Sequence, residues 1–470
     1  MSFVSTRGGD AGATFEEVML AGLASDGGLF VPQVWPSFEP GDLAALAGAP
    51  YHSVVAAVAG RLTGATFAES ELTALAEASY AGFGHPDVAP LRDLGDDMHL
   101  MELFWGPTLS FKDYALQLLG RLMDAVLDRR SERVTIVGAT SGDTGSAAIA
   151  ALQDRPTADV VILHPAGRVS DVQCRQMTTV TASNVHNVAI DGTFDDCQDL
   201  VKAMFADPGF RDEMHLSAVN SINFGRIMAQ ISYYLWAILR LDALDSGASF
   251  AVPTGNFGNV YAGYAARQMG LPVRSLIIGN NRNNGVTRLF TTGTLALEEV
   301  VPTTSPAMDI QVPSNLERLL FDISGRSGHV TATMMTDFRL RRTLNVPRSD
   351  LAKVSGLFRT AWMSDEAVEG YMGHVYRDTG ILLDPHSVIA VAAGRMRHDI
   401  PSVPLVAIAT AHPSKFPAAV ERGTGVLPAL PERLSDLFDR KERCTDLPND
   451  LGVVRSHIRG VVERRGLENR

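Results

Sequence analysis

The sequence predicts an α/β protein with two parallel-sheet domains and a mainly helical N-terminal domain. Two observations support this prediction. Short apolar runs rich in β-branched residues recur from about residue 133, and helical patterns lie between several of them. Before this pattern starts, residues 1–95 are rich in alanine, leucine and small polar residues. Strands that alternate with helices favour parallel sheets, because a crossover helix joins one strand to the next.

The N-terminal domain is expected over residues 1–95. Thr14 followed by Glu17 matches the capping-box pattern that opens a helix. A second helix is expected from Ser70 to Phe83. The turn-rich segments SDGGLFVP and VWPSFEPGD lie between them, so we expect loops there.

The strand-like runs define the two expected α/β domains, over residues 96–240 and 241–470. The runs are RVTIV (133–137), DVVIL (159–163), VHNVAI (185–190), SFAVP (249–253), VRSLIIG (273–279) and PLVAIAT (404–410). Helices are expected between several of them, for example where apolar residues recur at helical spacing from Ile227 to Ile238. In such sheets ligands bind beyond the carboxyl ends of the strands, where several glycine-rich segments lie.

Charge and cysteine content narrow the class of function. Lys and Arg total 41 and Asp and Glu total 53, so the formal net charge is −12. Nucleic-acid binding requires clustered cations, so no nucleic acid is expected as a partner. We recognise no membrane span, secretory signal or metal motif, and the three cysteines have no C-x-x-C spacing. We therefore expect a cytoplasmic protein without a membrane segment or a metal ion.

The segment PTGNFGN (253–259) follows an expected strand and precedes a helix expected from about Val260. Gly255 and Gly258 allow the backbone to bend and to approach a ligand closely. Successive N–H groups in front of a helix N-terminus form a binding site for an anion. The spacing matches neither a dinucleotide fingerprint nor a P-loop, so a monophosphate is favoured. A glycine-rich turn without a ligand is the alternative.

A second glycine-rich segment, GATSGDTGSAA (138–148), follows the run RVTIV. Ser141, Asp143 and Thr144 are residue types that start helices, so ordinary capping explains much of the pattern. The hydroxyl and N–H groups also suit a substrate carboxylate.

Lys112 lies near the start of an amphipathic helix, in the segment LFWGPTLSFKDYALQLLG (103–120). A surface lysine beside Asp113 is one interpretation. The other is a lysine that forms a Schiff base, for which the amine must lose its proton before it attacks an aldehyde.

Thr410 is expected at the carboxyl end of the run PLVAIAT. Its hydroxyl either binds its own backbone or faces a ligand. The element DPHS (384–387) is typical of a capped helix start, and no chemistry is assigned to it.

Together these motifs resemble the threonine synthase family, a group of fold-type II pyridoxal-phosphate enzymes. The segments that carry the resemblance are SDGGLFVP, ELFWGPTLSFKD, GATSGDTGSAA, NSINFGR (220–226), PTGNFGN and ATAHPSKF. They occur in the family's order between residues 25 and 416, and their combination is much more specific than any one of them. The resemblance implies two α/β domains like those of the tryptophan synthase β-subunit, after the extra domain of the family's longer, fungal-like branch.

The resemblance assigns a role to each candidate residue. Lys112 matches the lysine that holds pyridoxal 5'-phosphate as a Schiff base. The other cofactor-binding positions are Gly255, Asn256, Phe257, Gly258 and Asn259 at the phosphate and Thr410 at the pyridine nitrogen. The substrate-binding positions are Ser141, Asp143 and Thr144, and also Asn220, Ser221 and Arg226, which would hold the substrate's own phosphate. Trp105 stands where the family more often has histidine, so no proton transfer is assigned to it. Ser110 replaces a common alanine without an expected consequence.

The implied reaction is that of a lyase acting on O-phospho-L-homoserine. Phosphate leaves the γ-carbon and water adds at the β-carbon, which gives L-threonine, and the freed Lys112 amine takes the α-proton. The expected partners are this substrate and water, and the expected state is a monomer or a weak homodimer.

Two other functions share parts of the pattern. A serine/threonine dehydratase-like β-eliminating lyase uses the same scaffold and lysine but needs no second phosphate site. A non-catalytic relative that binds a phosphorylated metabolite would not need Lys112.

Overall fold

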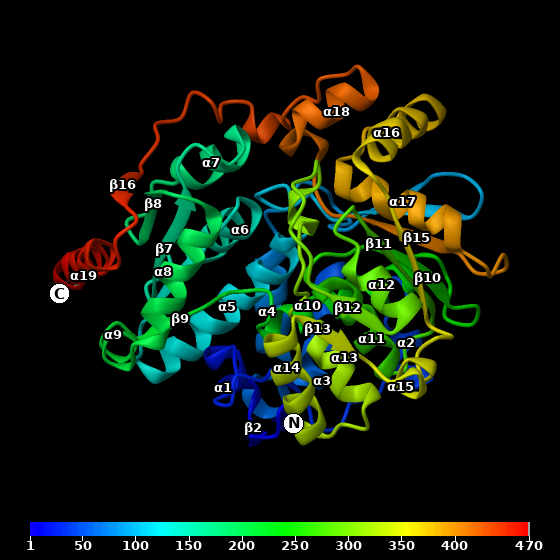
Figure 1. The fold of residues 1–470 in the computed structure, drawn as a ribbon, viewed down its shortest axis with the longest axis horizontal. Coiled ribbons are helices and arrows are strands. Elements are labelled where there is room, and N and C mark those ends of the chain that lie inside the picture. The colour runs from blue at the N-terminus through cyan, green and yellow to red at the C-terminus, as the bar shows by residue number, and fades with distance from the viewer. Residues whose placement is uncertain (469–470) are drawn as a thin grey trace. The chain divides into compact units, whose positions relative to one another are not determined.

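The computed structural model describes residues 1–468, which form two compact units (Figure 1). Unit 1 consists of Met1–Phe111 and Ser221–Pro428. Unit 2 consists of Lys112–Asn220 and the chain from Ala429 onward. Each unit contains its own parallel sheet with helices, so the predicted α/β class is confirmed.

A six-stranded sheet forms the centre of unit 1, with the strand order β14-β11-β10-β15-β5-β4. Neighbouring strands are parallel except for the antiparallel pair β4 and β5. The strands are β4 (Leu91–Asp93), β5 (Met98–Glu102), β10 (Ala248–Pro253), β11 (Val273–Asn280), β14 (Phe358–Trp362) and β15 (Leu405–Ala409). Every residue of β10 and β15 is buried, which explains their nearly continuous apolar sequence.

Helices cover both faces of this sheet. On β11, Leu276 packs against α11 (Gly258–Gln268), whereas Gly279 lies against Ile389 of α17 (Pro385–Arg397). Side chains alternate along a strand, so these contacts place α11 and α17 on opposite faces. The core beneath α17 contains Ala251, Ile277, Ile389, Ala407 and Ala409.

The other helices of unit 1 surround the sheet or connect its strands. They are α1 (Phe15–Ala21), α2 (Pro40–Ala45), α3 (Tyr51–Thr63), α4 (Glu69–Tyr80), α10 (Phe224–Arg240), α12 (Gly285–Thr292), α13 (Leu316–Ile323), α14 (Gly328–Arg341), α15 (Arg348–Ala352), α16 (Asp365–Thr379) and α18 (Pro417–Thr424). The short strands β12 (Thr294–Ala296) and β13 (Thr343–Asn345) form a separate antiparallel pair.

The N-terminal stretch is helical as predicted, but it also contains a small sheet. Thr14 and Glu17 form the expected capping box at α1. The helix expected from Ser70 to Phe83 is α4, which begins one residue earlier, at Glu69, and ends three residues earlier, at Tyr80. The strands β1 (Phe3–Ser5), β2 (Ala11–Ala13) and β3 (Phe30–Pro32) form an antiparallel sheet that the sequence analysis missed. Strands of three residues are too short to show an alternating pattern.

A five-stranded parallel sheet forms the centre of unit 2, with the order β16-β8-β7-β6-β9. Its strands are β6 (Val134–Ala139), β7 (Ala158–Pro165), β8 (Val185–Asp191), β9 (Leu216–Ser217) and β16 (Thr445–Pro448). Its helices are α5 (Lys112–Arg130), α6 (Asp143–Leu152), α7 (Asp171–Thr178), α8 (Phe194–Ala206), α9 (Pro208–Glu213) and α19 (Leu451–Glu468). Val161 and Val188 of the sheet share a core with Leu200 of α8 and Val454 of α19.

The units divide the chain at other positions than the domains expected over 1–95, 96–240 and 241–470. The N-terminal stretch belongs to unit 1, and the last part of the chain joins unit 2 through β16 and α19. Pairing of β5 with β15 places residues near 100 in the same sheet as residues near 405. The division into three consecutive domains, over 1–95, 96–240 and 241–470, stays a prediction. Among residues 1–468, no helix combines the length and the apolar character that a membrane crossing needs.

Candidate active site

In unit 1, two of the expected segments leave the sheet at the same edge. Strands β10 and β15 are parallel neighbours, with Ser249 opposite Leu405 and Ala251 opposite Ala407. The segment PTGNFGN follows β10, and Thr410 directly follows β15. The sequence therefore placed both segments correctly at carboxyl ends of strands, and the strand order makes them neighbours.

The loop after β10 ends in an open helix N-terminus. Phe257 precedes α11 in the left-handed conformation, with φ 63°, and no side chain caps the helix. The first N–H groups of α11 are thus available to an anion. The sharp bend falls on Phe257 rather than on a glycine. Gly255 is required for another reason, because a Cβ there would lie 2.5 Å from the carbonyl oxygen of Ala307.

Asn259 lies in the first turn of α11, and its side-chain amide accepts two hydrogen bonds at the oxygen but donates none to the described residues. The hydroxyls of Tyr233 and Tyr234 donate to Asn259 Oδ1 over 2.6 and 3.0 Å. Burial raises the pKa of both tyrosines well above its usual value, so both hydroxyls keep their protons and donate. Asn259 Nδ2 is buried without a hydrogen-bond partner among the described residues. Two acceptor contacts therefore fix the amide and leave its N–H groups for a ligand.

Arg226, on α10, is a buried cation without an anion. Among the side chains that the structure describes, it forms no ion pair, and its Nε and Nη1 atoms have no hydrogen-bond partner. Burial lowers its pKa to about 10, and at neutral pH the guanidinium stays charged. An unpaired buried charge is costly, so this group is suited to a ligand with negative charge.

Asn315 joins Ser221 to the loop after β10, which the sequence analysis did not foresee. Its Nδ2 donates to the carbonyl oxygens of Ser221 and Asn256 over 3.0 and 3.1 Å. The guanidinium of Arg318 orients Asn315 by donating to its Oδ1, and it also donates to the carbonyl oxygen of Ile222. No spacing in the sequence links these residues, because the contact joins segments 94 positions apart.

Thr410 has a free hydroxyl at the strand end. Its N–H donates to Ser387 Oγ over 3.0 Å, and its carbonyl oxygen accepts from the N–H of Phe111 over 2.8 Å. Among the described residues the Thr410 hydroxyl has no hydrogen-bond partner, although the residue is 6% exposed. The alternative that this hydroxyl binds its own backbone is therefore wrong.

In unit 2, Lys112 is the first residue of α5 and forms an ion pair. Its Nζ donates to Asp143 Oδ2 over 3.2 Å, and Asp143 Oδ1 accepts from Gln173 Nε2 over 2.7 Å. The lysine side chain is 11% exposed, so the surface-lysine alternative is wrong. Asp143 and Gln173 thus hold the amine in place, and Gln173 is a residue that the sequence analysis missed.

The loop after β6 is not capped as expected. The N-cap of α6 is Gly142, with φ 143°, and no side chain caps the helix. Instead Thr140 Oγ1 accepts from the N–H groups of Gly142 and Gly145. Ser141 is exposed and Thr144 is half-buried, whereas Asp143 between them is buried.

The candidate residues thus fall into two groups. Ser221, Arg226, Gly255–Asn259 and Thr410 belong to unit 1. Lys112, Ser141, Asp143, Thr144 and the exposed Asn220 belong to unit 2. The residue with the unexpected identity, Trp105, donates its indole N–H to Glu102 Oε2 over 3.0 Å in unit 1.

Comparison with known proteins gives consistent results over nearly the whole chain. Residues 2–80 match the family "Threonine synthase N terminus", residues 89–344 match "Pyridoxal-phosphate dependent enzyme", and residues 387–458 match "Threonine synthase, C-terminal". The chain is 50% identical to the threonine synthase of Pseudomonas aeruginosa over 97% of this chain and 98% of that protein.

Two solved structures are also similar. The threonine synthase of Brucella melitensis with bound pyridoxal phosphate has a TM-score of 0.96 and 45% identity, over 98% of this chain and 99% of that one. The yeast threonine synthase has a TM-score of 0.93 and 33% identity over the same shares.

Proposed function

The chain belongs to the threonine synthase family of pyridoxal-phosphate-dependent lyases, and on this premise we propose that it converts O-phospho-L-homoserine and water into L-threonine and inorganic phosphate. Membership gives the chain threonine synthase activity and pyridoxal phosphate as its cofactor. The proposal concerns the substrate and the residues that perform each task.

The residues of the candidate site fit a phosphorylated aldehyde cofactor. The open N-terminus of α11 and the buried, unpartnered Nδ2 of Asn259 suit a phosphate group. The Thr410 hydroxyl is a neutral partner for a ring nitrogen. The Lys112 amine is the nucleophile that an aldehyde requires. We assign Gly255, Asn256, Phe257, Gly258 and Asn259 to the cofactor phosphate, with the backbone N–H groups as donors.

When bound, pyridoxal phosphate supplies an aldehyde for amino groups and a ring that delocalises negative charge from the adjacent carbon. Lys112 Nζ then serves in two ways, as the covalent anchor and as the base that moves a proton at the substrate α-carbon. Asp143 receives a hydrogen bond from the ammonium form and thereby orients Nζ. Gln173 holds that carboxylate in turn.

The observation that carries the proposal is the buried, unpaired guanidinium of Arg226. A γ-phosphate substrate brings a second phosphate in addition to that of the cofactor, and a guanidinium matches phosphate geometry well. We assign Arg226, with Asn220 and Ser221, to the substrate phosphate. Ser141, Asp143 and Thr144 are assigned to the remainder of the substrate and the ring.

Product analysis tests this function against the dehydratase-like alternative. Holoenzyme incubated with O-phospho-L-homoserine is expected to release inorganic phosphate and L-threonine in equal amounts. A dehydratase-like lyase would release ammonia and a 2-oxo acid from L-serine or L-threonine, without any need for Arg226. Phosphate release without threonine, or 2-oxo acid as the main product, would contradict the proposal.

The Tyr233→Phe variant tests the orientation of Asn259. Loss of the 2.6 Å hydrogen bond to Oδ1 removes one of the two contacts that fix the amide and leaves that from Tyr234, so we expect the affinity for pyridoxal phosphate to fall about three- to tenfold. Cofactor titration of the apoprotein measures this loss. Tyr264→Phe is the matched control, because Tyr264 lies on the same helix as Asn259 and its hydroxyl has no hydrogen bond among the described residues. Equal effects in both variants would contradict the assigned role.

We further propose that the enzyme works in the cytoplasm as a monomer or a weak homodimer. Biosynthesis of threonine from a phosphorylated precursor is consistent with that location. Sedimentation at several protein concentrations measures the oligomeric state, and a concentration-independent tetramer would contradict the proposal.

A further inference from the structure

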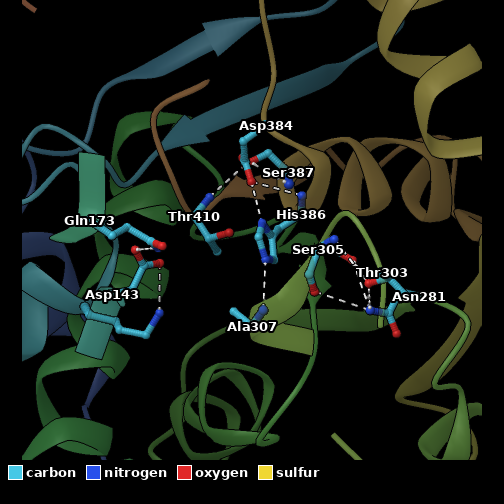
Figure 2. A network of polar contacts seen from close by, with 11 residues as sticks. Asp143, Gln173, Asn281, Thr303, Ser305, Ala307, Asp384, His386, Ser387 and Thr410 are labelled. Carbon is cyan, nitrogen blue, oxygen red and sulfur yellow. Dashed lines mark hydrogen bonds and ion pairs between the residues drawn. The ribbon is translucent and has the colours of Figure 1, made fainter. Parts of the chain in front are cut away.

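The element DPHS, at the start of α17, forms a hydrogen-bonded network in unit 1 (Figure 2). We propose that Asp384, His386 and Ser387 are positioning residues that hold the strand end at Thr410 and the loop at Ala307 in a fixed arrangement. We call these three residues the brace. This inference rests on the proposed function, because it assigns the brace to the two ends of the cofactor site.

The centre of the brace is the carboxylate of Asp384, which is completely buried. Its oxygens accept from the backbone N–H groups of His386 and Ser387 over 2.9 and 3.2 Å. They also accept from the Ser387 hydroxyl and lie 2.7 Å from His386 Nδ1. The two backbone contacts are sufficient for a helix cap, so the two side-chain contacts serve another purpose.

The first of these contacts reaches Thr410. The Ser387 hydroxyl donates its proton in a hydrogen bond to Asp384. Ser387 Oγ can therefore act as an acceptor, and it accepts from the Thr410 N–H over 3.0 Å. The carbonyl oxygen of Thr410 accepts from Phe111 on its other side. The backbone of Thr410 is therefore fixed on both sides, and only its side-chain hydroxyl stays free.

The second contact reaches the loop around Ala307. The N–H of Ala307 donates to His386 Nε2 over 3.3 Å, so this nitrogen carries no proton. The imidazole is thus the neutral tautomer with its proton on Nδ1, and this proton is donated to Asp384. The donors and acceptors of the brace therefore form two chains that end at Asp384. Ala307 donates to His386 and Thr410 donates to Ser387, and both of these side chains donate to the Asp384 carboxylate.

The loop around Ala307 lies directly on the proposed phosphate loop. The carbonyl oxygen of Ala307 lies so close to Gly255 that a Cβ added to this glycine would be 2.5 Å from that oxygen. Asn281 Nδ2 ties the preceding part of this loop by donating to Thr303 and Ser305 (Figure 2). His386 therefore acts on Gly255 through Ala307, whereas Ser387 acts on Thr410.

Two substitutions of His386 separate its two contacts. His386→Asn retains a donor near Nδ1 for Asp384 and lacks the acceptor for Ala307. His386→Gln retains an acceptor near Nε2 for Ala307 and lacks the donor for Asp384. The measurements are the dissociation constant of pyridoxal phosphate from the apoprotein and the melting temperature of the apoprotein.

We expect His386→Asn to lower cofactor affinity about tenfold while the apoprotein melts close to wild type. We expect His386→Gln to show the reverse, with nearly normal affinity and a lower melting temperature. If affinity instead follows the melting temperature in both variants, His386 is merely structural and the inference is wrong. His398→Asn is the matched control, since His398 caps the other end of α17 and its imidazole has, among the described residues, one hydrogen bond, with the backbone oxygen of Val403.

The double variant Ser387→Ala with His386→Asn tests whether the two contacts serve the two ends of the site separately. Ser387 acts on Thr410 and His386 acts on Gly255 through Ala307, so the two losses of cofactor affinity are expected to add, to about a hundredfold. The ³¹P resonance of the bound cofactor is expected to shift in His386→Asn and to stay unchanged in Ser387→Ala. A double variant that binds as tightly as a single variant, or a resonance that shifts only in Ser387→Ala, would overturn the inference. Wild-type protein that binds no cofactor would contradict the proposed function instead.

Discussion

Replacing Lys112 with alanine is expected to lower turnover about 10³-fold or more, because the substitution removes both the covalent anchor and the base. The fold is expected to persist. Asp143 would lose one partner but keep the hydrogen bond from Gln173, so its buried carboxylate would not be left unpaired. Steady-state release of phosphate measures the turnover, and circular dichroism measures the fold. Activity near that of wild type would show that another group performs both tasks.

Chemical trapping checks the same assignment without measuring activity. Borohydride reduction of the holoenzyme is expected to fix the cofactor on the peptide that contains Lys112. Lys415 provides an internal control, because it is also buried and its Nζ donates to the carbonyl oxygen of Thr108. Label on the Lys415 peptide would contradict the assignment, and a colourless protein that ignores added cofactor would contradict the whole account.

The Arg226→Met variant is expected to be more stable than wild type and nearly inactive. Removal of an unpaired buried charge should raise the free energy of unfolding of the apoprotein by about 1–3 kcal/mol. Loss of the substrate-phosphate contact should lower kcat/KM for O-phospho-L-homoserine about 10²- to 10³-fold. Denaturant unfolding and initial rates measure the two effects. A destabilised Arg226→Met protein would show that the guanidinium has partners in the apoprotein.

Arg318→Met is the matched control for this prediction. Arg318 is also buried, and burial lowers its pKa to about 10 as well. Its guanidinium differs in having partners, since it donates to Phe30, Asn315 and Ile222. We therefore expect Arg318→Met to lower the free energy of unfolding, in the opposite direction to Arg226→Met.

The sequence was sufficient for the α/β class and for six strands of the two larger sheets. Each of the six strand-like runs corresponds to a strand, because strands covered on both faces are largely apolar. The sequence did not show β4, β5, β9, β14 or β16, nor the N-terminal sheet or the discontinuous units. The sheet and the units depend on pairing between distant segments, for which a local pattern carries no signal.

The candidate site was predicted to a similar extent. The segments at Lys112, Gly255 and Thr410 were recognisable because backbone turns, helix starts and strand ends have local sequence signals. The residues that orient them were not recognisable. Gln173, Asn315 and the tyrosines at 233 and 234 are ordinary members of helices, and only their contacts show what they do.

By itself, the sequence determined which groups are available for chemistry: an amine at a helix start, a turn rich in N–H donors and a hydroxyl after a strand. The tertiary structure alone decided which polar groups keep hydrogen-bond donors that no protein atom uses. Among the described residues, the Asn259 amide nitrogen and the Arg226 guanidinium have no partner, whereas the side chains of Asp384, His386 and Ser387 are all hydrogen-bonded. The difference arises because hydrogen bonding depends on which distant atoms lie within about 3 Å. A chain encodes those distances only through its complete packing, so they cannot be read from any single segment.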